Sequence, residues 1–220
     1  VITLARLLRE HGYKPAVVSR GYGGKSRNPV NIVSDGNTIL MHPREAGDEP
    51  VLIARSLPAI PVVTGRNRYI AAKHALKKFD IDLIILDDAF QHRALFRNID
   101  ILLLDASRPF GNGLLIPGGS LREPIGSVER ADIIITTGAK EQSVSLVPHI
   151  MGKDFPGKPV FTGCRKATAV MKGLSGTILS TNYLYGKKIF AFSGIARPDN
   201  FLETIISLGG IIAGTLAFSD

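Results

Sequence analysis

Cysteine and tryptophan are nearly missing from this chain of 220 residues, which has one cysteine, Cys164, and no tryptophan. A single cysteine excludes an intrachain disulfide, and it excludes a metal site built from several thiolates of this chain. This usage fits a reducing cytosol. Long apolar runs are missing as well. No segment approaches the roughly 20 residues that a membrane span needs, and no secretory signal is recognisable.

Acidic residues are in deficit. The chain has 27 Lys and Arg against 19 Asp and Glu, so its formal net charge is +8 and its pI is near 9.7. The excess indicates anionic partners, such as nucleotide phosphates, a phosphorylated substrate or an acidic membrane surface. Aromatic-rich RNA-binding motifs and zinc-finger spacings are not found, so nucleic acid is not favoured as a partner.

Apolar strand patterns alternate with helical patterns through most of the chain. This rhythm predicts an α/β fold with a mainly parallel sheet flanked by helices. The stretch 139–185 is less regular, and we place a domain boundary there, with a core at 1–180 and the start of a second, smaller α/β domain at 181–220. The expected strands are 16–19, 31–34, 38–41, 61–64, 82–88, 100–105, 132–137, 188–193 and 211–218, and the expected helices are 1–11, 49–56, 67–79, 121–130 and 198–208.

Residues 82–93 contain the most informative motif. An almost wholly apolar run, typical of a strand buried on both faces in the centre of a parallel sheet, ends in Asp87 and Asp88, and Gln91 and His92 follow. Ligands bind beyond the carboxyl ends of such strands, and a Walker B element is a hydrophobic strand whose terminal acid holds Mg²⁺ on phosphates. The alternative is that one acid caps a turn and the other is solvated. We favour the functional interpretation.

A glycine-rich segment follows the first expected strand, at 19–26. It is not a Walker A loop, because Ser19 stands where that motif requires glycine, and it does not fit the dinucleotide fingerprint either. What remains is a loop that carries Arg20 and Lys25 to the end of a strand. Contact of Arg20 with a phosphate or substrate and a flexible turn with solvated charges both stay open.

Two further polar segments allow a structural and a functional interpretation. Asp48 and Glu49 begin an expected helix, where acids cap free N–H groups and complement the dipole. Taken alone they favour capping, although a carboxylate held there beside a phosphate can also act as general base. The loop 118–124 either lines a ligand site or begins a helix capped by Ser120.

Six motifs occur in order along the chain. Together they resemble the tetraacyldisaccharide 4′-kinases of lipid A synthesis, and the ordered set is specific although no single motif decides the matter. The motifs are Ser-Arg-Gly-Tyr-Gly-Gly (19–24), Glu-Ala-Gly-Asp-Glu-Pro (45–50), Asp-Asp-Ala-Phe-Gln-His (87–92), Phe-Gly-Asn-Gly with Leu-Arg-Glu-Pro (110–124), Phe-Ser-Gly-Ile (192–195) and the terminal Phe-Ser-Asp (218–220).

The resemblance implies a P-loop NTPase-like kinase. Such an enzyme uses MgATP to phosphorylate the 4′-hydroxyl of a tetraacylated glucosamine disaccharide 1-phosphate in lipopolysaccharide biosynthesis, at the cytoplasmic face of the bacterial inner membrane. By the same resemblance Asp48 is the catalytic base, and Asp87, Asp88 and Glu123 are the metal site. The residues implied in nucleotide or substrate binding are Arg20, Tyr22, Glu49, Gln91, His92 and Arg122.

The chain also departs from the family pattern. The family's Walker A loop would lie just before Val1, its membrane-anchoring helix would lie further upstream, and a histidine thought to partner the base would follow Asp220. We therefore expect a fragment that is close to inactive by itself. Ala89 replaces a glycine often found there, a change that we expect to be harmless.

Two rival hypotheses are kept. Walker B acids alone do not distinguish phosphoryl transfer from hydrolysis, so a P-loop GTPase or metallochaperone-like switch protein is the first rival. A non-catalytic nucleotide-binding or glycan-binding module is the second. A sugar-lipid acceptor assay separates the kinase from the switch protein, and nucleotide binding separates both from the module.

Overall fold

The computed structural model describes residues 1–138, 157–164, 166–173, 175–195 and 198–218. The chain forms two compact units, the first built mainly from Val1–Thr136 and the second mainly from the residues that follow Gly163. Ser219 and Asp220 of the last motif, and residues 139–156 of the expected boundary region, lie outside the described residues.

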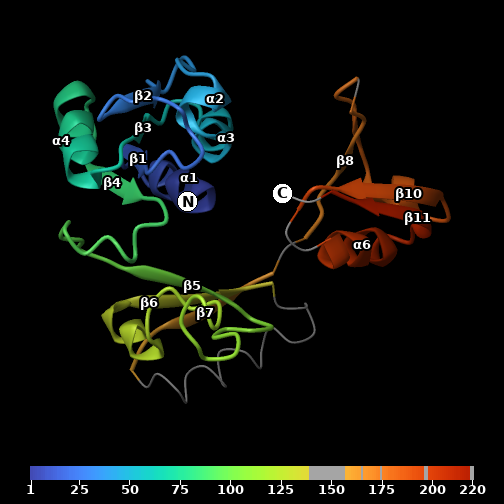
Figure 1. The fold of residues 1–220 in the computed structure, drawn as a ribbon. Coiled ribbons are helices and arrows are strands. Elements are labelled where there is room, and N and C mark those ends of the chain that lie inside the picture. Colours follow the sequence, from blue (N-terminus) through green and yellow to red (C-terminus); the bar gives the residue numbers. More distant parts are fainter. Residues whose placement is uncertain (139–156, 165, 174, 196–197, 219–220) are drawn as a thin grey trace. The chain divides into compact units, whose positions relative to one another are not determined.

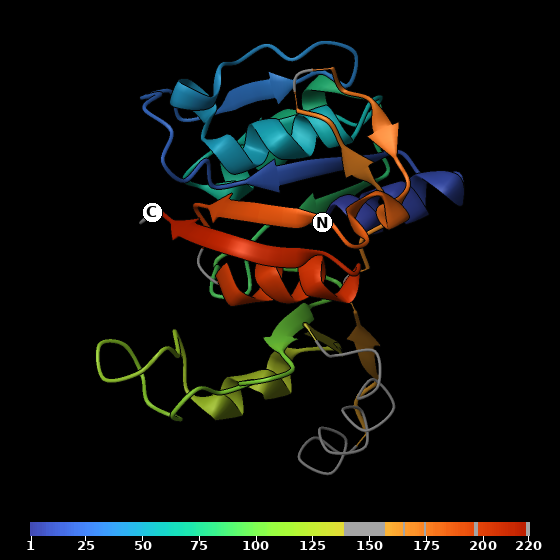
Figure 2. The ribbon, with the colours of Figure 1, turned by 90° about the vertical axis from the view of Figure 1, so that its right-hand side faces the viewer.

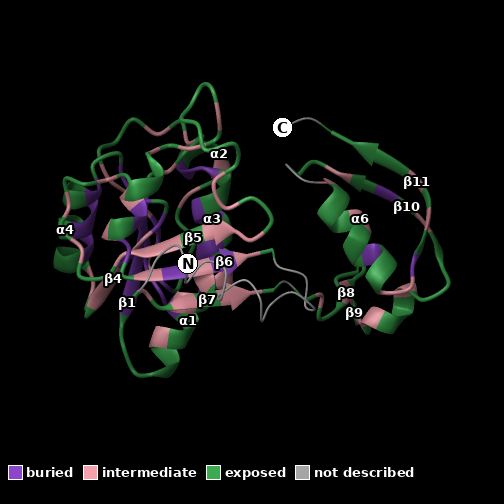
Figure 3. Ribbon diagram, turned by 90° about the horizontal axis from the view of Figure 1, so that it is seen from below, coloured by how far each residue is buried: buried purple, intermediate pink, exposed green. Residues whose placement is uncertain are grey.

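The first unit contains a four-stranded sheet with β1 (Pro15–Ser19) inside it (Figure 1). The strand order is β2-β3-β1-β4, with β2 (Asn31–Ser34) antiparallel to β3 (Val62–Thr64), and with both β3 and β4 (Leu83–Leu86) parallel to β1. All five residues of β1 are buried, as Figure 3 shows. The run Pro-Ala-Val-Val-Ser suits this place, since a strand covered on both faces has no need of alternating polar residues.

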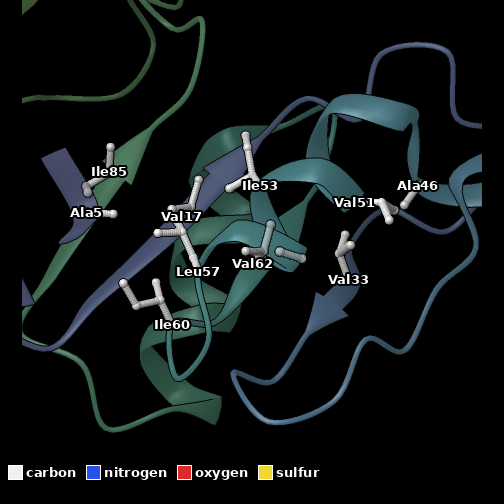
Figure 4. Packing of buried hydrophobic residues seen from close by; sticks show 11 residues of the cluster. Ala5, Val17, Val33, Ala46, Val51, Ile53, Leu57, Ile60, Val62 and Ile85 are labelled. Atoms are coloured by element: carbon white, nitrogen blue, oxygen red, sulfur yellow. The ribbon is translucent and has the colours of Figure 1, made fainter. Parts of the chain in front are cut away.

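Helices cover both faces of this sheet. Because successive side chains of a strand point to opposite faces, Val17 belongs to the core under α1 (Ile2–Glu10) and α3 (Asp48–Ser56) (Figure 4), and Val18 to the core under α4 (Arg68–Lys78). The first core includes Ala5, Val33, Val51, Ile53, Leu57, Ile60, Val62 and Ile85, and the second includes Val63, Ala71 and Ala75. Two cores of branched apolar residues therefore hold the carboxyl ends of β1, β3 and β4 at one edge.

A second sheet of the first unit has the order β5-β6-β7. It consists of β5 (Ile101–Asp105), β6 (Ile133–Thr137) and β7 (Val160–Gly163), and a 3₁₀ helix, η1 (Ile125–Arg130), precedes β6. Its small core is Val128, Ala131 and Ile134, with Phe90, Leu102, Leu104, Phe110 and Val160 packed against it. Phe90, a residue of the acid motif, therefore packs against the core of the β5-β6-β7 sheet.

The second unit contains the β-α-β segment that the sequence predicts. Strand β10 (Lys188–Ser193) is parallel to β11 (Ile211–Ala217), and α6 (Pro198–Ser207) connects them and packs on one face (Figure 2). Ile205 is the buried residue of α6. The unit also contains a two-stranded antiparallel pair and a short 3₁₀ helix, namely β8 (Val170–Met171), β9 (Ile178–Leu179) and η3 (Thr181–Leu184).

The predicted central position of the strand before Asp87 is wrong. Among the described residues β4 pairs with β1 alone, and only Ile85 of its four residues is buried. Strands β1 and β3 hold the inner places instead. An apolar run indicates that a strand is buried. It does not indicate which strands are its neighbours in the sheet, because those are set by pairing with distant segments.

Two other predicted elements are also wrong. The strand expected at 38–41 is reduced to an isolated bridge between Ser34 and Ile39, next to a turn in which the Asp35 carboxylate accepts from two backbone N–H groups. The helix expected at 121–130 begins only at Ile125 and is a 3₁₀ helix. Pro124 disfavours the helical conformation of the residue before it, and its own ψ of 151° is extended. Ser120 therefore caps no helix.

Candidate active site

The glycine-rich loop after β1 is held against the next helix of the chain. The N–H groups of Lys25 and Ser26 donate to the carbonyls of Arg44 and Glu45, at 3.0 and 3.1 Å. A side chain at Gly24 would collide with that same Glu45 carbonyl, so only glycine permits the approach. The loop is therefore attached to this helix at Lys25 and Ser26, while the side chains of Arg20 and Lys25 are exposed.

This loop lines a cavity of about 720 Å³ at the carboxyl ends of β1 and β3. Arg20 and Tyr22 line it from the loop, and Arg66 lines it from the segment after β3. The ring of Tyr22 is 86% exposed, so its surface is available to a ligand. The cavity is rich in arginine, and its other lining residues include Arg27, Asn28, Asn31, Glu45, Ala46, Thr64 and Asn67.

A short helix, α2 (Pro43–Ala46), leads into α3 and was not predicted. His42 caps α2, accepting through Nδ1 from the N–H of Arg44, while Glu45 completes a capping box. Gly47 separates the two helices with φ 94° and ψ 153°, a conformation that only glycine adopts readily.

Asp48 is the first residue of α3. Gly47 holds the cap position there, and no side-chain hydrogen bond caps the helix. Asp48 still complements the helix dipole, but it is not a hydrogen-bonding cap, so the structural interpretation that the sequence favoured is wrong in this respect. Its side chain is exposed. Ala46, on one side of it in the chain, lines the cavity.

Glu49, on the other side of Asp48, faces the acid motif. Partial burial raises the pKa of Glu49 above its usual range, and the nearby carboxylates of Asp87 and Asp88 raise it further. Three carboxylates predicted from separate motifs thus converge at this edge of the sheet.

The two acids after β4 have different surroundings. Asp87 is buried and accepts from the hydroxyl of Ser19 at 3.0 Å. Asp88 is exposed, has a φ of 42°, and accepts from Arg122, whose Nη1 lies 2.9 Å from each carboxylate oxygen. The left-handed backbone at Asp88 turns the two carboxylates apart, one toward β1 and one toward the loop of Arg122.

His92 closes the acid motif and is partly buried. Burial lowers the pKa of His92, and the positive charges of Arg68, Arg97 and Arg20 lower it further. Its Nε2 is buried and has no hydrogen-bond partner among the described residues. The imidazole is therefore held in its neutral form, which can donate to or accept from a ligand. The side chain of Gln91 is exposed.

Glu123 pairs with Arg130 at 2.5 Å, and both side chains are mostly buried. The guanidinium of Arg130 therefore already pairs with the Glu123 carboxylate, which the family resemblance implies to be part of the metal site. Across the described ranges, no group of three or more His, Cys, Asp or Glu side chains is arranged to hold a metal. A magnesium ion held by one or two carboxylates together with substrate phosphates needs no such group, so a single carboxylate of the acid motif would be enough for such a site.

Sequence reasoning missed four residues of this region: Ser19, Arg68, Arg97 and Arg130. Arg68 carried a signal, since it follows the end of β3 at the same sheet edge as the acids. The other three contact the acid motif from positions 5 to 68 residues away in the chain, and their residue types alone do not reveal these contacts.

Comparison with known proteins supports the resemblance. A family model described as tetraacyldisaccharide-1-P 4′-kinase (LpxK) matches residues 1–220. The chain belongs to this family.

Its LpxK relatives include the tetraacyldisaccharide 4′-kinases of Syntrophus aciditrophicus, 48% identical over 229 residues, and of Desulfotalea psychrophila, 40% identical over 220 residues. These matches cover 100% and 99% of this chain but only 61% and 62% of the relatives. The chain therefore spans less than two thirds of the length of these LpxK proteins.

A solved structure is also similar, the "apo" form of LpxK from Aquifex aeolicus in complex with ATP. Its TM-score is 0.78 at 32% identity, over 100% of this chain and 65% of that one. The predicted P-loop NTPase-like α/β fold class is thereby confirmed. None of the described helices is long and apolar enough to cross a bilayer.

Proposed function

We propose that the LpxK protein containing this chain transfers the γ-phosphoryl group of ATP to the 4′-hydroxyl of a tetraacylated glucosamine disaccharide 1-phosphate. One observation carries the proposal, namely that the residues flanking Asp48 in the chain belong to two differently built regions. Ala46 lines an arginine-rich cavity, and Glu49 interacts with the carboxylates of Asp87 and Asp88. A general base must reach the acceptor's hydroxyl while that hydroxyl lies beside the γ-phosphate, so it is expected between the acceptor pocket and the metal and nucleotide site.

The cavity suits the acceptor's polar head. Its volume of about 720 Å³ falls in the range of small-molecule sites, about 300–1,000 Å³. Arg20, Arg27 and Arg66 supply charge for a phosphorylated sugar, since guanidinium groups bind phosphate through paired hydrogen bonds. Tyr22 offers an exposed ring on which a sugar can pack.

The nucleotide end is formed by the acid motif. We assign Asp87 and Asp88 as the protein's carboxylate ligands for Mg²⁺, which when bound neutralises charge on the phosphoryl oxygens. Neutral His92 and exposed Gln91 would contact the nucleotide or its metal shell. The ion pair of Glu123 with Arg130 is mostly buried, unlike the exposed pair of Asp88 with Arg122, and this favours a supporting role for Glu123 over direct coordination. The side chain of Arg122 is 59% exposed although it pairs with Asp88, so it would be available to stabilise the transferred phosphate.

In the proposed step the 4′-hydroxyl oxygen attacks the γ-phosphorus in line. The bond from the γ-phosphorus to the β,γ-bridging oxygen breaks, and ADP leaves with that electron pair. The Asp48 carboxylate accepts the hydroxyl proton. Basic side chains from the cavity wall and Arg122 offset the negative charge that collects on the phosphoryl oxygens.

The membrane surface is the proposed place of reaction. The acyl chains of such an acceptor remain in the bilayer, so the enzyme must work at the lipid–water boundary. The net charge of +8 favours attraction to an anionic cytoplasmic leaflet. We accordingly propose a location at the cytoplasmic face of the inner membrane.

The decisive test uses the full-length protein with radiolabelled ATP, Mg²⁺ and tetraacyldisaccharide 1-phosphate in mixed micelles. The expected result is label in the disaccharide, dependent on both Mg²⁺ and acceptor. Nucleotide hydrolysis unaffected by acceptor would instead support the switch-protein rival. Nucleotide binding without turnover of any kind would support the non-catalytic module.

A further inference from the structure

Three arginines hold three alternate backbone carbonyls of the acid motif. Arg68 donates to the carbonyl of Asp88 at 3.3 Å, and Arg97 to that of His92 at 2.6 Å. Between them, Arg130 donates to the carbonyl of Phe90 at 3.5 Å. The donors come from three different segments: the first turn of α4, the loop before β5, and the end of η1.

Arg68 is the most buried of the three, at 6% exposure. Desolvation lowers its pKa, and the nearby charge of Arg20 lowers it further. Its two described hydrogen bonds go to backbone carbonyls, of Asp88 and Arg66, and its Nε is buried without a described partner. Burying a guanidinium without a direct carboxylate bond is costly, so packing alone does not account for an arginine here. Its contact falls on Asp88, the residue with a left-handed backbone.

Arg97 and Arg130 are themselves fixed by acids. Arg97 donates to both carboxylate oxygens of Asp100, at 2.6 and 3.0 Å. Arg130 pairs with Glu123 and lies over the ring of Phe90, 4.6 Å from its centroid. Asp100 thus orients Arg97 through Nε and Nη2, which leaves Nη1 to donate to the motif, while Arg130 donates from the same Nη2 to both Glu123 and the carbonyl of Phe90.

We propose that Arg68, Arg97 and Arg130 are positioning residues that hold the backbone of residues 88–92 in the conformation needed to direct the Asp87 and Asp88 carboxylates. This inference rests on the proposed kinase function. The motif lies beyond the end of β4, where no strand pairing among the described residues fixes it, and the acids need a rigid backbone to meet a metal. Three charged donors on alternate carbonyls supply that rigidity.

Hydrogen exchange of the His92 amide reports the state of this backbone directly, because its N–H donates to the carbonyl of Ala89 at 2.8 Å inside the motif. The test compares full-length Arg97→Gln, Arg130→Gln and Arg68→Lys with the parent. Lysine is chosen at position 68 to keep the buried charge and allow folding. Exposed Arg55 on α3 provides the matched control, Arg55→Gln.

The expected result is exchange at His92 about ten- to a hundredfold faster in the three variants, as losing a hydrogen bond to a charged group implies. Amides of β1 and β3 should keep their protection, and Arg55→Gln should match the parent throughout. Equal exchange at His92 in folded variants overturns the proposal. Uniform acceleration across the whole unit also overturns it, because that would mean a general loss of stability.

A kinetic readout separates positioning from simple structural support. The Mg²⁺ concentration for half-maximal phosphorylation should rise about tenfold or more in the variants, with a smaller change in kcat at saturating Mg²⁺. A fall in kcat with unchanged Mg²⁺ dependence contradicts a role in directing the two acids. If the parent itself transfers no phosphate, the proposed function fails, while the exchange measurement still decides whether the arginines hold the motif.

Discussion

Arg122 donates from one nitrogen to both carboxylate oxygens of Asp88, across 34 residues of sequence. Both side chains are more than half exposed, at 59% and 64%. An ion pair so open to solvent adds at most about 1 kcal/mol to stability. The pairing therefore has more to do with where these charges lie than with holding the fold together.

Arg122→Gln should leave the stability nearly unchanged and slow phosphoryl transfer. A change in the free energy of unfolding of less than about 1 kcal/mol is expected, with a fall in kcat of about 10- to 1000-fold from losing one contact to developing charge. Urea unfolding and steady-state kinetics of the full-length protein check this. Large destabilisation with normal kcat would show that the pair is structural.

Asp87→Asn and Asp88→Asn should both weaken Mg²⁺-dependent turnover while the fold stays intact. At position 87 the amide oxygen of asparagine can still accept from Ser19, so the buried contact is kept and only the charge is lost. The measurement is turnover across a range of Mg²⁺ concentrations, with circular dichroism as a check on folding. Parent-like Mg²⁺ dependence in both variants would assign these acids to structure alone.

Asp48→Asn tests the proposed base. General base catalysis contributes about 100- to 10,000-fold, so kcat should fall by that order. The melting temperature should hardly move, because the side chain caps no backbone N–H group. Glu10→Gln, an exposed acid at the end of α1, is the control and should keep parent kcat. An active Asp48→Asn enzyme would remove Asp48 from the mechanism.

Gly47→Ala should damage fold and site together. The Gly47 backbone conformation costs other residues about 1–3 kcal/mol, and an added Cβ would strike the carbonyl of Tyr22. We expect destabilisation of that order and reduced kcat, because Asp48 follows directly. Gly126→Ala is the matched control, since a Cβ there meets open space. Equal melting temperatures for both variants would contradict the close contact between Gly47 and the carbonyl of Tyr22.

The ring of His92 should titrate below the ordinary histidine value of about 6.5, because burial and three arginines lower its pKa. Since the folded pKa is depressed, the stability from the neutral ring is fully present above the unfolded pKa, and it is lost as pH falls below that value and through the folded pKa. NMR titration of the ring C–H signals, assigned with His92→Asn, checks the midpoint. Arg97→Gln should raise the midpoint of the His92 titration, because it removes one of these positive charges. A midpoint above about 6.5 in the parent would refute the depressed pKa.

The sequence by itself determined which segments are covered and which residue types stand at their ends. The apolar run before Asp87 predicts a strand that ends in acids, and β4 does end at Leu86 with Asp87 next. The pattern after Lys188 likewise predicts β10, α6 and β11 to within one residue. These features are local, since a strand or helix pattern and the residue that follows it occupy adjacent positions in the chain.

Tertiary structure alone decided which strand lies inside the sheet and which partner each charged side chain takes. Strand β1 lies inside the sheet because it pairs with β3 and β4, which are distant in the chain. The pairing of Asp88 with exposed Arg122 also joins distant segments. The same holds for the arginines that donate to the carbonyls of Asp88, Phe90 and His92. The sequence suggested Asp48 as a cap because acids are common at helix starts, but Gly47 took the cap position. Burial and long-range hydrogen bonding settle such choices, because the energy of each contact depends on a partner that local sequence does not contain.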